Sequence, residues 1–456
     1  MDLELDLIRL AADRAIAYAE TIDDRAVTPS PAAIDGVAAF AEPLPDHPTD
    51  PYETIDLLDR IGSPATQGTT SGRYFGFVNG ATYPVALAAS FIADAWDQNA
   101  ALPVMSPVSA AIHDVARGWL LDVLGLPGES AVAFVTGATV ANASCLAAAR
   151  DALLSGAGWD APANGLFGAP EICVVVGAHA HSTLRKSLGF VGLGNERVSV
   201  VPTDGQGRII ADRLPDLPRD VPVLLCAQAG EVNTGAFDPF DRLADWATGR
   251  RCWLHVDGAF GLWALGDPSR ADLVRGLDRA DSWATDGHKW LNVTYDCGIA
   301  IVRRPDALRR TFASVAGYLP PDVGFEAMHH TPQSSQRARQ IEVWAVLRTL
   351  GRSGVASVVQ RACDAATRIA DRLANEDGFV VLNEVVLNQV LVRFGDAATT
   401  KRLIAAVQRD GRIWCGATQW NGSTAMRISV SSWKTTRDDA RAAAEVILES
   451  ARELSA

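Results

Sequence analysis

The sequence contains no pair of cysteines at a metal-binding or redox spacing. Its seven cysteines stand singly along the chain: Cys145, Cys173, Cys226, Cys252, Cys297, Cys363 and Cys415. Several lie in apolar, strand-like runs, and their number is odd, which argues against a disulfide framework. We therefore expect buried free thiols in a reducing compartment.

The chain also lacks segments that direct proteins to membranes. Its beginning, MDLELDLIRLAADRAIAYAE, has neither a basic region nor an apolar core, which argues against a signal peptide. No apolar run reaches the roughly 18 residues that a membrane span requires. A net charge of −13 argues against nucleic acids and anionic membranes as partners, although a pocket can still bind a small anion. We expect a cytoplasmic protein.

What the chain does contain is typical of a globular α/β protein. Hydrophobic residues make up 48% and charged residues 21% of its 456 residues, a length that favours two or more domains. Between residues 83 and 310, helical segments alternate with short apolar strands. The strands are predicted at 131–135, 171–176, 197–201, 222–228, 252–257 and 298–304. This alternation predicts a large domain with a mostly parallel sheet covered on both faces.

Two further regions flank this predicted domain. Residues 1–82 form an N-terminal helical segment, in which the apolar spacing over residues 2–20 predicts an amphipathic helix. Residues 27–52, rich in Pro and Asp, are predicted to be extended. Residues 311–456 carry one long helix and several strand-like runs, which predicts a smaller α+β domain.

One lysine, Lys289, lies in DSWATDGHKWLNVTYDCGIAI, between residues typical of a buried sheet. A lysine is rarely buried without a partner. Either its amine reaches the surface from a strand end, or it is held in a dry pocket. In a dry pocket the pKa of the amine falls, and the neutral form can bond to an aldehyde.

Asp257 and the turn TGAT (136–139) both follow predicted strands, where ligands bind in open α/β sheets. Asp257 either caps a turn or pairs with a cationic ring nitrogen, and the small residues Gly258 and Ala259 would admit a flat ring. TGAT is no P-loop, because GxxxxGK[ST] is missing. It either caps a helix or binds a single phosphate.

His181 lies in GAHAHST, after another predicted strand. Together with His179 it could ligate a metal, but no third ligand has suitable spacing, and we predict no metal site. It could also be an ordinary core or surface histidine. The more specific hypothesis is an imidazole that stacks on the face of a bound aromatic ring.

In their order along the chain, these residues resemble the pyridoxal-phosphate-dependent decarboxylases of the group with aromatic-L-amino-acid and glutamate decarboxylases. The resemblance extends from RYFGFVNGATYP (73–84) to MRISVSSW (426–433). It is most specific in HVDGAFG (255–261) and DGHKWLNVTYDCG (286–298). It implies an aminotransferase-like, fold type I large domain, pyridoxal 5′-phosphate as cofactor, and a homodimer.

The resemblance also implies which residues hold the cofactor: Gly137, Ala138, Thr139, His181, Asp257, Ala259, His288 and Lys289. Lys289 would bond to the cofactor aldehyde, Asp257 would pair with the pyridine nitrogen, and His181 would stack on the ring. The TGAT turn and His288 would lie at the phosphate. Catalysis would use Lys289, His181 and Tyr318, the last matching the family's presumed proton donor on a mobile loop.

The implied reaction is decarboxylation of an L-amino acid to its amine. An aldehyde synthase, a carbon–carbon lyase such as an aldolase, or a regulatory protein that retained the fold are the alternatives. Glu231 and Gln336 depart from the family pattern, where some relatives have a small hydroxyl residue and an arginine. We expect an aromatic or hydrophobic substrate, although AWDQNA (95–100) adds polar groups. Four aromatic residues either line the substrate pocket or pack in the core: Phe75, Phe77, Tyr83 and Trp96.

Overall fold

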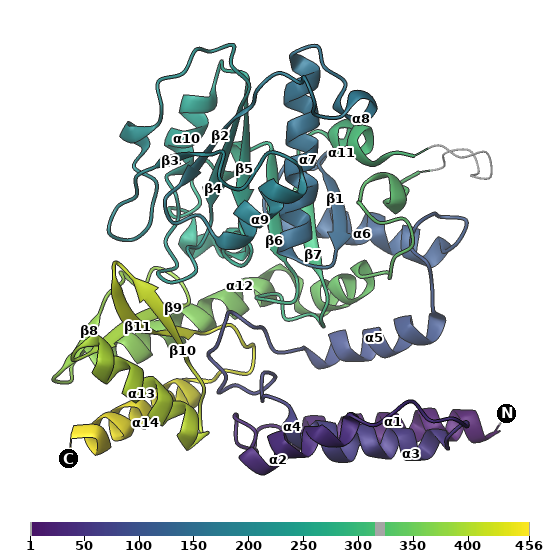
Figure 1. Cartoon of the computed structure of the whole chain (residues 1–456), viewed down its shortest axis with the longest axis vertical. Helices are drawn as coiled ribbons and strands as arrows, with labels where there is room; N and C mark the ends of the chain where they lie inside the picture. The colour runs from purple at the N-terminus through teal and green to yellow at the C-terminus, as the bar shows by residue number, and fades with distance from the viewer. Residues whose placement is uncertain (1, 315–323, 456) are drawn as a thin grey trace.

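The computed structural model describes residues 2–314 and 324–455 of the chain. Tyr318 therefore lies outside the described residues. Two sheets organise the described part, a large mixed sheet and a small antiparallel one (Figure 1). Among the helices of this part, none combines the length and the apolar character needed to cross a membrane.

The large sheet has seven strands in the order β1-β7-β6-β5-β4-β2-β3. Their bounds are β1 (Ala131–Val135), β2 (Cys173–Gly177), β3 (Ser199–Val201), β4 (Val223–Gln228), β5 (Cys252–Asp257), β6 (Ser282–Asp286) and β7 (Gly298–Val302). Neighbouring strands from β6 to β3 are parallel, whereas β7 runs antiparallel to both β6 and β1. The predicted mostly parallel sheet is confirmed, with β6 as a strand that the prediction did not list.

Helices cover both faces of this sheet, because its strands are apolar on both sides. In β1, Ala131, Ala133 and Val135 join one core, and Val132 and Phe134 join the other. The first core includes residues of α7 (Ala138–Gly156), α9 (Ser182–Phe190) and α11 (Pro305–Phe312). The second includes residues of α6 (Pro107–Val123), α10 (Phe240–Ala247) and α12 (Gln340–Ala374). This double burial matches the continuous apolar runs in the sequence.

The N-terminal region is more helical than predicted. It contains α1 (Asp2–Thr21), α2 (Pro31–Gly36), α3 (Pro51–Leu57) and α4 (Ser63–Ala65), and α5 (Pro84–Trp96) follows directly after it. The prediction that residues 27–52 are extended throughout is wrong. The Ser30 side chain accepts a hydrogen bond from the Ala33 N–H, and Pro31 occupies the first turn, so α2 begins there. In Figure 1, α1 and α3 lie next to each other below α5, away from the large sheet.

The small sheet has the order β10-β11-β9-β8 and is antiparallel throughout. Its strands are β8 (Phe379–Val381), β9 (Gln389–Phe394), β10 (Gly416–Trp420) and β11 (Ser423–Ser429), packed with α13 (Ala397–Asp410) and α14 (Arg437–Ser455). The prediction had omitted β10. The long α12, interrupted at Gly351 with φ of 60°, contacts both α6 and the small sheet. The domain limits at residues 82 and 310 stay a prediction.

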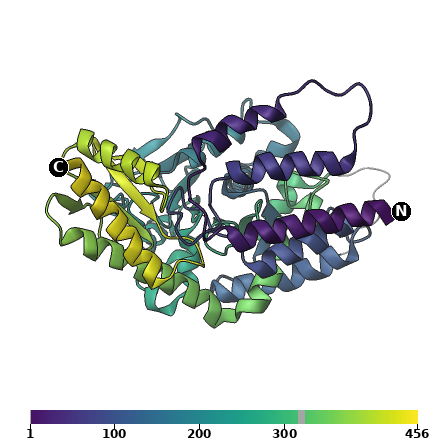
Figure 2. The same ribbon diagram turned by 90° about the horizontal axis from the view of Figure 1, so that it is seen from below.

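Short helical elements join these larger ones. They are α8 (Ala161–Asn164), η1 (Val37–Phe40), η2 (Leu58–Gly62), η3 (Ala211–Arg213), η4 (Gly261–Gly266), η5 (Pro268–Arg270), η6 (Leu277–Arg279) and η7 (Ala327–His329). All seven cysteines are free, and five of them are buried. The view from below in Figure 2 shows the N-terminal helices beside the small domain and along one side of the molecule.

Candidate active site

Lys289 lies three residues beyond the end of β6, in a turn that brings its amine back to that strand. Its Nζ is 3.0 Å from Oδ2 of Asp286, whose side chain is 3% exposed. The Lys289 side chain itself is 24% exposed, so it is half-buried rather than buried as predicted. A carboxylate partner makes this degree of burial possible for an ammonium group.

The turn at Lys289 is enclosed by the N-terminal part of the chain. A Cβ atom at Gly80 would lie 1.9 Å from the Lys289 carbonyl oxygen, so only glycine allows this approach. The Tyr83 N–H donates to the Asn292 carbonyl at 2.9 Å, and the Tyr295 hydroxyl donates to Oδ1 of Asn79. The segment RYFGFVNGATYP thereby helps to fix the position of Lys289.

Asp257 ends β5 and is almost completely buried, with 4% of the residue exposed. Its Oδ1 accepts a hydrogen bond from the N–H of Ala259 at 3.2 Å. Burial raises the pKa of Asp257, and the neighbouring His181 and Lys289 partly oppose this effect. A carboxylate in this environment is stabilised by a cationic partner, such as a protonated ring nitrogen.

A buried polar network lies behind Asp257, and sequence reasoning missed it. The side chain of Asn142, on α7, contacts His255 through Oδ1, at 2.8 Å from Nε2. Its amide nitrogen lies on the side of Asp257 and lowers the pKa of that carboxyl, without full hydrogen-bond geometry. The HVDGAFG motif contained one signal of this network, a histidine two residues before the aspartate in an otherwise apolar strand.

His181 caps the N-terminus of α9, in the segment that follows β2. Its backbone N–H donates to Oε1 of Gln228 at 3.1 Å, and its Nδ1 accepts from the Thr183 N–H at 3.3 Å. Burial lowers the pKa of His181, and the charges of Asp257 and Lys289 both act on this ring. The structure thus brings these three predicted residues into one site, with a neutral imidazole.

The neighbouring His179 belongs to a different environment. Its Nδ1 lies 2.7 Å from Oγ1 of Thr203, and its ring lies against Trp420 with centroids 4.8 Å apart. Within residues 2–314 and 324–455, no three His, Cys, Asp or Glu side chains are grouped as a metal site would require.

The TGAT turn meets the Lys289 segment at the N-terminus of α7. The Ala138 N–H donates to Oδ1 of Asp286 at 2.5 Å, and Gly137 provides no side-chain cap. His288 lies beside them, with Nε2 3.7 Å from the same Oδ1. Its Nδ1 accepts from the Cys297 N–H at 3.1 Å, which places the ring proton on Nε2. Asp286, which the sequence analysis did not single out, therefore connects the predicted phosphate residues with the lysine.

Glu231 does not present a free carboxylate to this site. It is 2% exposed, and its oxygens accept from the Asn233 N–H at 2.7 Å and the Thr234 N–H at 2.8 Å. The carboxylate therefore stabilises its own turn. Arg427, from β11 of the small domain, lies nearby and donates to the Val232 carbonyl at 3.3 Å. Burial lowers the pKa of Arg427, and the charge of Glu231 opposes this.

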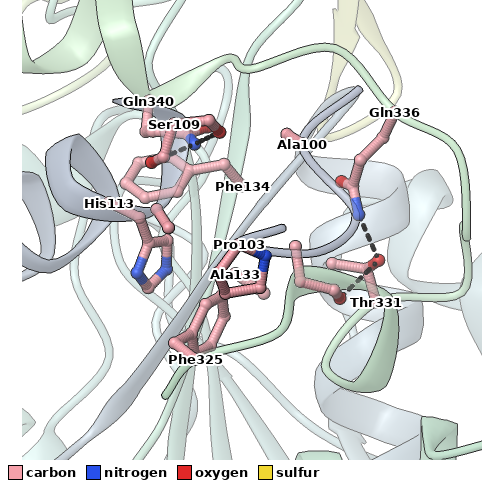
Figure 3. A pocket seen from close by; sticks show the side chains of 12 residues that line it. Ala100, Pro103, Ser109, His113, Ala133, Phe134, Phe325, Thr331, Gln336 and Gln340 are labelled. Carbon is pink, nitrogen blue, oxygen red and sulfur yellow. Dashed lines mark hydrogen bonds between the residues drawn. The ribbon is translucent and has the colours of Figure 1, made fainter. Parts of the chain in front are cut away.

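Gln336 lines a separate pocket between α6, β1 and the start of α12 (Figure 3). Its Nε2 donates to Oγ1 of Thr331 at 3.0 Å, so the side chain stabilises the conformation of the segment before α12. In the same pocket, the rings of His113 and Phe325 stack with centroids 3.7 Å apart. Gln340 donates to Oγ of Ser109 at 2.6 Å.

The four aromatic residues of the N-terminal segment divide into two groups. Phe75 and Tyr83 belong to the main hydrophobic core, and Tyr83 stacks on Trp433 with centroids 4.7 Å apart. Phe77 and Trp96 are exposed, at 64% and 43%. Phe75 and Tyr83 are therefore packed in the core, and a role of any of the four in lining the substrate pocket stays a prediction.

Comparisons with known proteins agree with this geometry. The family model described as the pyridoxal-dependent decarboxylase conserved domain matches residues 41–394. The acidic amino acid decarboxylase of Bos taurus is 28% identical over 328 residues, which cover 69% of this chain and 62% of that protein. The aromatic-L-amino-acid decarboxylase of Bacillus atrophaeus is 24% identical, covering 88% of this chain and 85% of its own.

The chain thus spans less than two thirds of the Bos taurus relative. The solved structure of Oryza sativa TDC with PLP and tryptamine has a TM-score of 0.90 and 22% identity, covering 100% of this chain and 98% of its own. This likeness confirms the predicted aminotransferase-like, fold type I architecture.

Proposed function

Because the chain belongs to the pyridoxal-dependent decarboxylase family, we propose that it converts an L-amino acid into its amine and carbon dioxide. Pyridoxal 5′-phosphate is the cofactor of this family and of this chain. One observation carries the proposal: the charges of Asp257 and Lys289 both act on the half-buried His181 ring, at the ends of three strands.

The residues present fit this cofactor. An amine at Lys289 suits its aldehyde, a buried carboxylate at Asp257 suits its ring nitrogen, and a neutral imidazole at His181 suits its ring face. The N-terminus of α7 and the Nε2–H of His288 suit its phosphate. When bound, the cofactor supplies an electron sink for the charge left by the departing carbon dioxide.

The protein's own groups would then have distinct roles. The Asp257 carboxylate keeps the ring nitrogen protonated, and His181 holds the ring in place. Arg427 would bind and orient the carboxylate of the substrate, since it is a half-buried guanidinium beside His181 and reaches the site from the small domain. Tyr318, outside the described residues, would return the proton to the α-carbon.

We further propose an aromatic or hydrophobic side chain on the substrate. If Arg427 binds the α-carboxylate, an acidic side chain would require a second cation. The Glu231 carboxylate lies close enough to act on Arg427 and would disfavour further negative charge. Relatives named for acidic substrates, such as the Bos taurus protein, belong to the same family. Membership of the family therefore does not determine the side chain of the substrate.

The proposal includes a homodimer in the cytoplasm. Apolar side chains are exposed on three helices of one region, α1, α5 and α6: Leu5, Ile8, Ile16, Phe91, Ile92, Trp96, Val108, Val115 and Trp119. Leu7 and Leu10 of α1 are half-buried. An exposed apolar surface of this kind is typical of a subunit interface. A second copy of the chain would cover it.

Two measurements test the proposed function. Borohydride reduction and peptide mapping should place the cofactor on Lys289, and a panel of amino acids should release carbon dioxide from aromatic or hydrophobic members. Release of an aldehyde with ammonia and peroxide would indicate an aldehyde synthase instead. Cleavage of a side chain without carbon dioxide would indicate a carbon–carbon lyase, and a label on another lysine would contradict the site.

A further inference from the structure

Asp286 occupies the N-terminus of α7, at the position proposed for the cofactor phosphate. The helix has no side-chain cap of its own, and the carboxylate from the end of β6 takes this role by accepting the Ala138 N–H at 2.5 Å. A negative charge is favourable there because of the partial positive charge of the helix end. The N-terminus of α7 would therefore stabilise the negative charge of both Asp286 and a phosphate.

Without ligand, the charge of Asp286 is balanced by Lys289, whose Nζ lies 3.0 Å away. Once the lysine nitrogen is joined to the cofactor, it is no longer a free ammonium partner for this carboxylate. The side chain of Asp286 is 3% exposed, so water cannot replace that partner. A phosphate at the α7 terminus would then add further negative charge at close range.

The other titratable groups that face Asp286 do not supply a lasting positive charge. His288 lies with Nε2 3.7 Å from Oδ1, but burial lowers the pKa of His288. Burial raises the pKa of Tyr295 to about 12 and also raises that of Cys297, so both are neutral near pH 7. Two anions held together without a cation share a proton, as paired carboxylates do.

We propose that Asp286 couples binding of the cofactor's phosphate group to the uptake of one proton from solvent. The proton is held in a hydrogen bond between the Asp286 carboxyl and a phosphate oxygen. This inference rests on the phosphate position proposed above. It makes the affinity for a phosphorylated ligand fall as the pH rises, because the proton becomes harder to acquire.

The test uses the full-length protein freed of cofactor and pyridoxal 5′-phosphate as the ligand, because its aldehyde removes the free ammonium of Lys289 that balances Asp286. A proton lost from Lys289 on binding is lost in every variant that keeps this lysine, so it cancels when variants are compared. Calorimetry at pH 8 in two buffers with different heats of ionisation counts the protons taken up on binding. The wild type should take up about one proton more than Asp286→Asn, which retains the shape of the side chain without its charge.

Affinity gives a second readout. At pH 8 the Asp286→Asn variant should bind this ligand at least about tenfold more tightly than the wild type, and its affinity should vary less with pH. The matched control is Asp281→Asn. Asp281 accepts a backbone N–H from Leu254 at 2.9 Å, at the opposite end of β6, and this change should leave both quantities unaltered.

The outcomes separate the two parts of the inference. Equal proton uptake and equal affinity for wild type and Asp286→Asn would overturn the coupling. Unphosphorylated pyridoxal binding as tightly as pyridoxal 5′-phosphate would instead overturn the phosphate position. If Asp286→Asn does not fold, the wild type decides alone: the phosphorylated ligand should take up about one proton more than the unphosphorylated one.

Discussion

Nε2 of His255 lies 2.8 Å from Oδ1 of Asn142, and the other ring nitrogen lies 2.9 Å from Oγ of Ser282. Because an amide oxygen only accepts, the ring proton is on Nε2, and the Ser282 hydroxyl donates to Nδ1. That hydroxyl in turn accepts from Nε1 of Trp253 at 2.8 Å. The Trp253 N–H, the Ser282 hydroxyl and the His255 Nε2–H thus form a chain of donors that ends at Asn142. The amide nitrogen of Asn142 lies on the side of Asp257.

Burial lowers the pKa of His255 to about 3, so this ring is neutral at every pH at which the protein is expected to work. The network therefore acts on Asp257 through oriented dipoles, and it adds no charge. Asn142 lowers the pKa of Asp257, which favours the anion that a protonated ring nitrogen requires.

The first prediction concerns Asn142→Ala. Removing a group that lowers the pKa of Asp257 should raise that pKa, so the acidic limb of the kcat profile should move to higher pH. We expect kcat at neutral pH to fall about tenfold, as for loss of one polar contact to a charged group. Ser144→Ala is the control, since Ser144 donates to Val140 on its own helix. An unshifted pH profile for Asn142→Ala would show that the network serves folding alone.

The second prediction concerns Asp257→Asn. The amide fills the same space and should retain the cofactor, but it cannot keep the ring nitrogen protonated. We expect kcat to fall by at least about a hundredfold while cofactor absorbance stays near the wild-type value, in line with loss of a preorganised electrostatic partner. Activity within a few-fold of the wild type would exclude Asp257 as the ring's partner.

The third prediction concerns Arg427. If it binds the substrate carboxylate, Arg427→Gln should raise KM about tenfold to a hundredfold, since a charge-assisted hydrogen bond contributes about 1.5–3 kcal/mol. Arg427→Lys should recover part of the loss, because the charge remains without the planar fork. Arg393→Gln, on the neighbouring strand β9, is the matched control, because Arg393 is also a half-buried arginine of the small sheet. An unchanged KM for Arg427→Gln would assign Arg427 to packing.

The fourth prediction concerns Tyr318. It rests on the resemblance of AGYLPP to the family's catalytic loop. Tyr318→Phe should still bind substrate and release carbon dioxide, but without its proton donor it should form aldehyde, ammonia and peroxide under air. Product analysis of this variant decides the matter. Amine formation at nearly the normal rate, with no aldehyde, would indicate that Tyr318 only packs against the small domain.

The sequence predicts best where local pattern and burial agree. β5 was predicted with its observed bounds, because CWLHVD is apolar nearly throughout and buried on both faces. In contrast, β6 reads SWATD, and its polar end resembles a loop although all five residues are buried. The short α2 was missed because Pro and Asp dominate its surroundings, and the capping by Ser30 outweighed that composition.

The site residues also divide into those that the sequence identifies and those that it does not. Lys289, Asp257 and His181 could be identified because each stands beside a strand end within a specific motif. Asp286 could not, because its role depends on the N–H of Ala138, which is far away in the sequence. Arg427 was equally hidden, since it reaches the site from the other sheet. Contacts between distant segments have no periodicity that a single sequence displays.

The position of β7 in the large sheet has a consequence for how the chain acquires its structure during synthesis. β1 has β7 as its neighbour at the sheet edge, yet β1 ends at Val135 and β7 begins at Gly298. At about 5–20 residues per second, a ribosome needs roughly 8–30 s to make the intervening chain. Throughout that time the apolar β1 has no strand to pair with. Slow, non-local closure of this kind leaves the nascent chain open to aggregation, and its yield should depend on chaperones and temperature.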